Sequence, residues 1–251
     1  MTEGEYLIIG WSTKGDRLVK ELNAYHRDAG KESPEIMVIH DGSVNTEAYH
    51  QQDDYKHITF VAGDAFDKGF LRSVHAHRAS RVIILADENN PDADGMNALV
   101  ALGIRALSNE EGTHPYMIVE AVNHRKSGHI KDAGADEVIC FTDYQMGLLA
   151  QTSLHPRMSE VYLDLLTVGH TGAEDCEIYM VDDMKPDSWE KFFEGKTFSE
   201  SARMFLDENP PAILMGVKRK DGIILNPLPG DFKAWEEGDV PIFVAYGRPG
   251  I

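Results

Sequence analysis

Tyr6-Leu-Ile-Ile-Gly10-Trp-Ser-Thr-Lys-Gly15-Asp-Arg-Leu-Val-Lys-Glu-Leu22 is the stretch of sequence that decides the fold. Its first four residues are apolar and predict a buried parallel strand, which stops at a glycine. Leu18, Val19 and Leu22 then recur on one face of a helix. A strand that turns at glycine into a helix is typical of the first βαβ unit of a Rossmann-like fold, where backbone N–H groups at the helix N-terminus form an anion site.

The glycines of this turn depart from the dinucleotide-binding fingerprint. The sequence has the pattern G-x-S-x-x-G, and Ser12 stands where a glycine would let the backbone approach a pyrophosphate most closely. The βαβ unit is therefore predicted with two interpretations of its turn. It is either a nucleotide site or a turn that is retained for packing alone.

Strand and helix patterns alternate through the first half of the chain. Six apolar segments are separated by helical segments or by turns, which predicts an α/β fold with a Rossmann-like, doubly wound parallel sheet. The predicted strands cover residues 6–9, 35–40, 58–62, 81–86, 116–121 and 135–140.

The pattern changes after the sixth strand. Helical segments flank Pro156, whose ring prevents one helix from running through both. We interpret them as a crossover that grips a second subunit or, alternatively, as an ordinary connector. Shorter strands and a helix then predict a small α+β lobe. The expected parts are a Rossmann-like N-lobe at 1–141, a helical crossover and dimerisation segment at 142–169, and a C-lobe at 170–251.

Composition limits the partners of the chain. Its 251 residues carry a formal net charge of -18, which argues against nucleic acid, because binding phosphates requires clustered Lys and Arg. Cys140 and Cys176 lie in no paired motif, as expected in a reducing cytosol. No apolar run approaches the roughly 20 residues of a membrane span. We expect a cytoplasmic domain whose membrane anchor, if it has one, comes from another segment or polypeptide.

Several short motifs, in this order and spacing, resemble RCK (regulator of K⁺ conductance, or KTN/TrkA-like) domains over nearly all of the chain. Glu177-Ile-Tyr179 and the Asn226-Pro227 pair resemble the branch that contains the twin-RCK bacterial potassium channels and the plant Castor/Pollux channels. The other motifs are Gly10-Trp-Ser12, Gly63-Asp-Ala-Phe-Asp67 with Leu71, Ala133-Gly-Ala-Asp-Glu-Val-Ile139, Gly216-Val-Lys-Arg219 and Glu237-Gly-Asp239.

The resemblance implies a cytosolic ligand-sensing domain that assembles into a gating ring and regulates the opening of a potassium channel. Its implied partners are a second copy of itself, a ring of eight RCK domains as the larger assembly, and a membrane pore domain absent from this chain. The domain would lie at the inner face of the membrane. The alternative within transport is a peripheral TrkA/KtrA-like subunit of a K⁺ transporter.

The resemblance also implies a site for NAD or an adenine nucleotide. Phosphates would lie against the turn, with the Lys14 ammonium as their counter-charge. Asp41 follows the second strand, where a carboxylate accepts hydrogen bonds from ribose hydroxyls. Asp64 follows the third strand and would lie near the adenine. The residues expected to bind the cofactor are Gly10, Trp11, Ser12, Lys14, Gly15, Asp41, Asp64, Ala65 and Ala86.

A Ca²⁺ ion is the second candidate ligand. Glu120 aligns with a glutamate that calcium-gated RCK domains use, and Asp87 and Glu88 offer the hard oxygen ligands that Ca²⁺ prefers. The match is partial, since Ala86 and Val122 stand where those domains carry acids. A solvated acidic loop is the alternative.

The C-lobe contains no convincing Ser/His/Asp or Cys/His arrangement. We therefore expect that the chain is not an enzyme. An NAD-dependent oxidoreductase, with catalytic residues in the C-lobe, is the alternative from another functional class.

Overall fold

The computed structural model describes residues 6–28, 30–167, 176–228, 230 and 232–251. The chain forms two compact units, Met1–Pro156 and Arg157–Ile251, and each is described by itself. The predicted boundary between the crossover and the C-lobe, at 169/170, lies outside the described residues.

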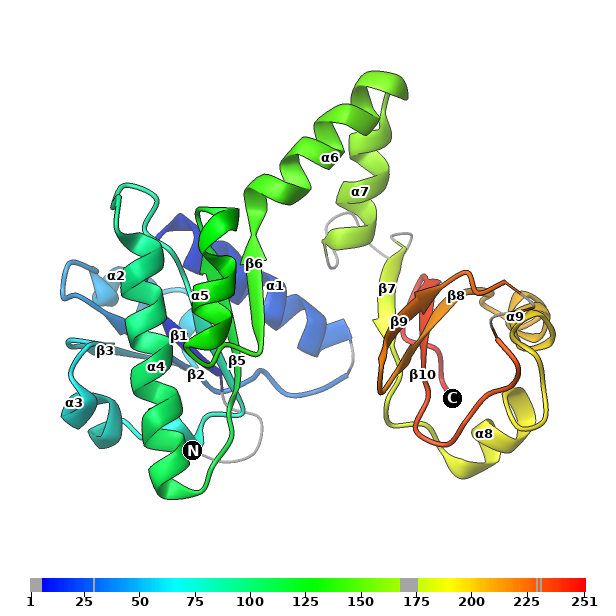
Figure 1. Cartoon of the computed structure of the whole chain (residues 1–251), viewed down its shortest axis with the longest axis horizontal. Coiled ribbons are helices and arrows are strands. Elements are labelled where there is room, and N and C mark those ends of the chain that lie inside the picture. The colour runs from blue at the N-terminus through cyan, green and yellow to red at the C-terminus, as the bar shows by residue number, and fades with distance from the viewer. Residues whose placement is uncertain (1–5, 29, 168–175, 229, 231) are drawn as a thin grey trace. The chain divides into compact units, whose positions relative to one another are not determined.

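A six-stranded parallel sheet forms the centre of the first unit (Figure 1). Its order, β3-β2-β1-β4-β5-β6, reverses direction between β1 and β4, as in a doubly wound fold. Tyr6 pairs with Ile36 on one side and with Arg81 on the other. The predicted fold class is confirmed. The strands are β1 (Tyr6–Ile9), β2 (Ile36–His40), β3 (Ile58–Ala62), β4 (Arg81–Ile84), β5 (Tyr116–Ala121) and β6 (Glu137–Cys140).

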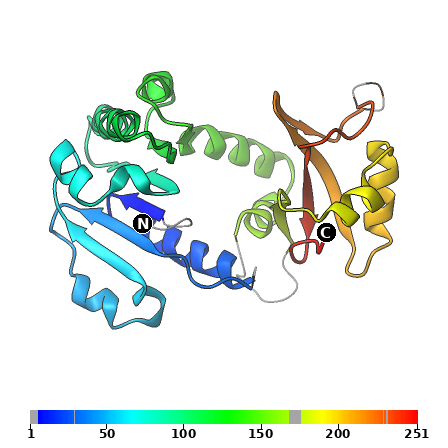
Figure 2. The same ribbon diagram turned by 90° about the horizontal axis from the view of Figure 1, so that it is seen from below.

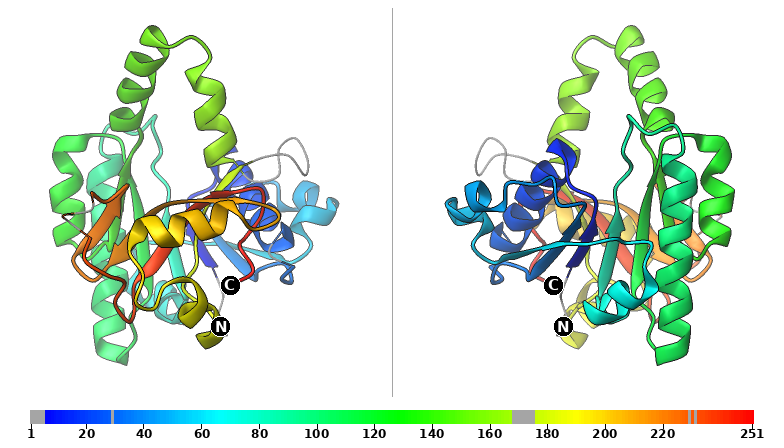
Figure 3. Two further views of the ribbon diagram at one scale, coloured as in Figure 1. Left: turned by 90° about the vertical axis from the view of Figure 1, so that its right-hand side faces the viewer. Right: turned by 90° about the vertical axis from the view of Figure 1, so that its left-hand side faces the viewer.

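Alternate strand residues enter two different cores, because successive side chains of a strand point to opposite faces of the sheet. Leu7 and Ile9 pack in one cluster with α4 residues such as Ile104, whereas Ile8 packs in the other with Val19 of α1. Figure 3 shows α1 on one face of the sheet, and α4 and α5 on the other. Since both faces are covered, the strands are mainly apolar.

Helices and short 3₁₀ turns connect these strands. The short helix α2 was not predicted because its five residues carry no apolar stripe. The helices are α1 (Thr13–Asp28), α2 (Thr46–His50), α3 (Lys68–Ser73), α4 (Ala93–Glu111), α5 (Ser127–Asp132) and α6 (Phe141–Leu154), and the 3₁₀ turns are η1 (Asp53–Tyr55), η2 (Ala76–Arg78) and η3 (His124–Lys126).

The second unit begins with α7 (Met158–Leu166) and contains a four-stranded antiparallel sheet of order β7-β10-β8-β9. Two helices, α8 and α9, pack on one face of this sheet through an aromatic core, and Figure 2 shows them on that side. The elements are β7 (Glu177–Met180), α8 (Pro186–Phe192), α9 (Phe198–Leu206), β8 (Ala212–Arg219), β9 (Gly222–Leu225) and β10 (Val240–Ala245). The small α+β lobe of the prediction is therefore present.

The helices α6 and α7 differ from the others in their surroundings. Neither has a buried residue, although both are rich in large apolar side chains. Those exposed by half or more include Met146, Leu149, Leu154 and Val161. None of the described helices is long and apolar enough to cross a membrane.

Candidate functional site

A cavity of about 540 Å³ opens at the carboxyl ends of β1 to β4, where the strand order reverses. This is the position at which open α/β sheets bind their ligands, and the volume lies in the range of small-molecule pockets. Gly10 and Asp41 line the cavity directly after β1 and β2, and Asp64 lines it two residues after the end of β3. Gly10 has a φ of 90°, which a residue with a side chain adopts only under strain.

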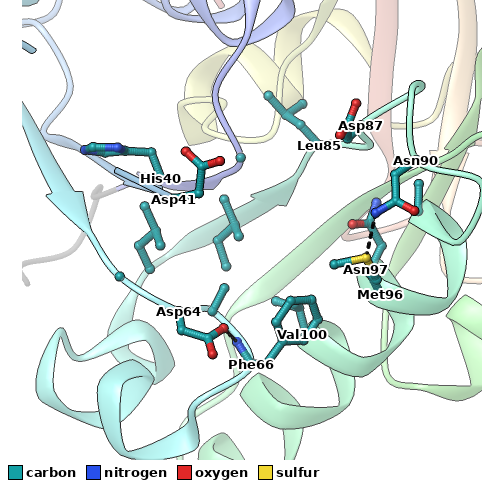
Figure 4. Close-up of a pocket in the computed structure, with 16 residues that line it drawn as sticks. His40, Asp41, Asp64, Phe66, Leu85, Asp87, Asn90, Met96, Asn97 and Val100 are labelled. Atoms are coloured by element: carbon teal, nitrogen blue, oxygen red, sulfur yellow. Dashed lines mark hydrogen bonds between the residues drawn. The ribbon is translucent and has the colours of Figure 1, made fainter. Parts of the chain in front are cut away.

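Two of the lining carboxylates are held by local turns. Asp41 Oδ1 accepts hydrogen bonds from the Ser43 N–H at 2.9 Å and from the Ser43 hydroxyl at 2.6 Å. These bonds hold the pKa of the Asp41 carboxyl below its ordinary value, so the group is ionised at neutral pH. Asp64 Oδ1 accepts a hydrogen bond from the Phe66 N–H at 2.9 Å. Both carboxylates are thereby oriented beside the cavity (Figure 4).

Lys14 belongs to a different cluster. Its Nζ donates hydrogen bonds to the Ala86 carbonyl oxygen at 2.8 Å, to Glu120 Oε1 at 2.8 Å and to Glu88 Oε1 at 3.1 Å. Burial alone would lower the pKa of Lys14, but the hydrogen bonds to Glu120 and Glu88 outweigh burial and raise it. Glu120 Oε2 in turn accepts from the Ala86 N–H at 2.8 Å. The first helix is thus tied to the ends of β4 and β5.

This cluster bears on the expected Ca²⁺ site. The side chain of Glu120 is only 7% exposed, and its two oxygens are already paired with the Lys14 ammonium and the Ala86 N–H. Asp87 lines the cavity instead, and Glu88 is exposed. No group of three or more His, Cys, Asp or Glu side chains that could hold a metal ion is found among the described residues. The Ca²⁺ site stays a prediction that these contacts do not favour.

The remaining residues of the glycine turn have packing roles. A Cβ atom at position 15 would lie 2.7 Å from Cε3 of Trp11, so Gly15 makes room for the indole. That ring packs edge-on against Phe60 and Tyr49. Ser12 Oγ accepts a hydrogen bond from the Lys14 N–H at 3.2 Å.

The structure therefore divides the predicted cofactor residues into two sets. Gly10, Asp41, Asp64 and Ala65 line the cavity, and Asp87 joins them there. The other predicted residues, which do not line it, are Trp11, Ser12, Lys14, Gly15 and Ala86.

One wall of the cavity is formed by α4, a contribution to the site that was not predicted from the sequence. Its lining residues recur every three or four positions, a helical stripe that the sequence contains and that would have indicated a shared face. Asn97 Nδ2 donates to the Glu120 carbonyl oxygen at 3.0 Å, which fixes this wall to β5. His40, the last residue of β2, also lines the cavity and was not predicted. The lining residues of α4 are Ala93, Met96, Asn97 and Val100.

Comparison with known proteins gives the chain a family. The family model described as the TrkA-N domain matches residues 6–141, more than half of the chain. YugO of Bacillus subtilis, whose name describes it as a potassium channel protein, is 25% identical over 226 residues, which are 88% of this chain and 60% of YugO. The ion channel CASTOR of Lotus japonicus is 25% identical over 248 residues, which are 95% of this chain and 27% of CASTOR.

Among solved structures, the human SLO3 gating ring superposes on 96% of this chain and 44% of its own, with a TM-score of 0.67 and 18% identity. At that identity the likeness concerns the fold. The chain spans 60% of the length of YugO and about a quarter of that of CASTOR. The resemblance to RCK domains, and to the Castor/Pollux branch among them, is confirmed. With a Rossmann-like first unit that the family model covers throughout its sheet, the chain belongs to the TrkA-N domain family.

Proposed function

We propose that this chain is the cytoplasmic regulatory domain of a potassium channel and that it senses an adenine nucleotide. The observation that supports this most is the cavity at the carboxyl ends of β1 to β4, with Asp41 and Asp64 beside it. Relatives named as potassium or ion channels support the transport role. Since those relatives are longer than this chain, the pore would belong to a segment outside it.

In this proposal the adenosine part of NAD or AMP lies between the ends of β2 and β3. Asp41 would accept hydrogen bonds from the ribose hydroxyls, because its carboxylate is ionised and held in place by Ser43. Asp64 and Ala65 would lie beside the base. Gly10 lines the same cavity and places no side chain in it.

Regulation requires that the ligand bind one conformation of an assembly better than another. The assembly would form through the crossover helices, whose large apolar side chains are left uncovered within each described unit. A dimer is the minimal form, and a ring of eight RCK domains is the larger one. The proposed parts are an N-lobe at 1–141, the crossover at 142–169 and the C-lobe at 170–251.

Asp41→Ala is expected to weaken AMP binding by more than about tenfold, because hydrogen bonds to a charged acceptor contribute about 1.5–3 kcal/mol each. Isothermal titration calorimetry of the purified chain with AMP and with NAD measures this directly. Asp132→Ala, at an exposed position at the end of α5, is the matched control and should bind as the unchanged chain does. Binding that survives Asp41→Ala would contradict the site, and turnover of NADH would favour an oxidoreductase instead.

Leu149→Asp is expected to convert a dimer into monomers, because it places a charge on the apolar surface of α6. The Leu149 side chain is 62% exposed in the single chain and would be buried between subunits. Light scattering at tens of micromolar protein measures the mass of the particle. Gln145→Asp, an exposed polar position of the same helix, is the control and should remain dimeric. A strictly monomeric unchanged chain, with and without ligand, would contradict assembly through α6.

A further inference from the structure

The charge of the cavity does not suit the phosphates of a nucleotide. Its 16 lining residues include three aspartates, Asp41, Asp64 and Asp87, and neither Lys nor Arg occurs among them in the described part of the chain. Phosphate sites in proteins are built from Arg and Lys side chains, free backbone N–H groups or bound cations. The carboxylates here would repel a phosphate.

The Lys14 ammonium, which was expected to bind the phosphates, already makes its hydrogen bonds within the protein. All three hydrogen bonds that a lysine can donate are used by Lys14, toward the Ala86 carbonyl oxygen, Glu88 and Glu120. Turning Lys14 toward a phosphate would leave the buried Glu120 without its counter-charge, which is costly in a site of low dielectric constant. Lys14 is therefore held away from the role of a phosphate ligand.

The glycine turn supplies few groups that could bind a phosphate instead of Lys14. Of its six residues only Gly10 lines the cavity. Gly15 does not line the cavity, and the indole of Trp11 packs directly against it. The N–H of Lys14 is paired with Ser12 Oγ, and Asp16 adds a negative charge in the first turn of α1.

The rest of the cavity suits a nucleoside. Its walls are mainly apolar, with Ile39, Leu85 and Val100 among the side chains that could contact a base. Asp41 and Asp64 lie on one side of the cavity and Asp87 lies on the other, so a ligand inside it has carboxylates on both sides (Figure 4).

We infer that this cavity selects adenosine itself, and that each phosphate group added to adenosine weakens binding. The inference rests on the proposed function and narrows its ligand to the nucleoside part. The apolar walls and the Asp41 carboxylate supply the affinity. The phosphates would meet the carboxylates of the cavity rather than a Lys or Arg side chain.

Calorimetric titration of the whole chain with adenosine, AMP and ADP, without divalent cations, tests this inference. At low salt, adenosine should bind roughly tenfold more tightly than ADP, because several like charges approach within a Debye length. Raising the salt from about 50 mM to about 300 mM should narrow this difference, since salt screens the repulsion. A phosphate site built on cations would show the opposite sign, with ADP binding weakened by salt.

Two variants of the same loop sharpen the test. Asp87→Asn should raise the affinity for ADP relative to adenosine about threefold, because it removes one of the three carboxylates that line the cavity. Asp92→Asn changes an exposed acid that does not line the cavity, and it should leave that ratio unchanged. ADP binding as tightly as adenosine, or more tightly, would overturn the inference while leaving the proposed function intact. If none of the three compounds binds, the proposed adenine ligand fails, and this inference fails with it.

Discussion

Phe193→Ala is expected to lower the free energy of unfolding of the second unit by about 3–5 kcal/mol, the cost of removing a large aromatic side chain from a packed core. Phe193 follows α8 and is completely buried. Its ring lies 4.5 Å from that of Trp235 and 5.6 Å from that of Phe205, measured between ring centroids. Because these rings join α8 and α9 to the sheet, the cavity left by the truncation cannot collapse locally.

Chemical denaturation followed by tryptophan fluorescence measures this loss. Two of the three tryptophans, Trp189 and Trp235, belong to the aromatic core and report its unfolding. Leu206→Ala is the matched control, because this leucine ends α9 with 55% of its surface exposed and should change stability by less than about 0.5 kcal/mol. Equal stability of the two variants would show that the aromatic core is not what stabilises the second unit.

The fold could be predicted from the sequence because its signals are local. Tyr6–Ile9 is apolar at successive positions, so both of its faces must be covered. Strands covered on both faces are typical of a parallel sheet with helices on its two sides. The turn at Gly10 marks the point where β1 passes into α1. The helices α2 and α8 escaped prediction because each is shorter than two full helical repeats of an apolar stripe.

The candidate site could be predicted only in part. Asp41 and Asp64 were found because each follows a strand, and the carboxyl ends of parallel strands meet at one edge of a sheet. Lys14 was expected to pair with phosphates, but its ammonium contacts Glu120 instead. This contact was not predicted because Glu120 is 106 residues away along the chain. No local pattern reports such a pairing. Likewise, Gly15 has the spacing of the third fingerprint glycine, which lets a helix pack closely, but here the neighbour that requires a glycine is Trp11.

Lys14→Met is expected to destabilise the first unit by about 3 kcal/mol, because it leaves the buried Glu120 carboxylate without its counter-charge. Glu120→Gln should lower the stability of the first unit by a smaller amount than Lys14→Met does. The freed Lys14 ammonium is 31% exposed and can recover hydration, and a glutamine oxygen can still accept the Ala86 N–H. The two residues of the ion pair therefore differ: the loss of stability is larger when Glu120, the more buried partner, is the one left unpaired. Glu88 contributes little, since its side chain is 67% exposed.

The double variant Lys14→Met/Glu120→Gln completes the cycle and should be about as stable as Glu120→Gln alone, because no buried charge then lacks a partner. Denaturation followed by the fluorescence of Trp11, the tryptophan of the first unit, measures all four proteins. The same four proteins also distinguish the two roles considered for Lys14. If its ammonium served a phosphate, Lys14→Met would keep its stability and lose affinity for ADP. If it ties α1 to β4 and β5, as its three hydrogen bonds indicate, stability falls and the ratio of ADP to adenosine affinity does not.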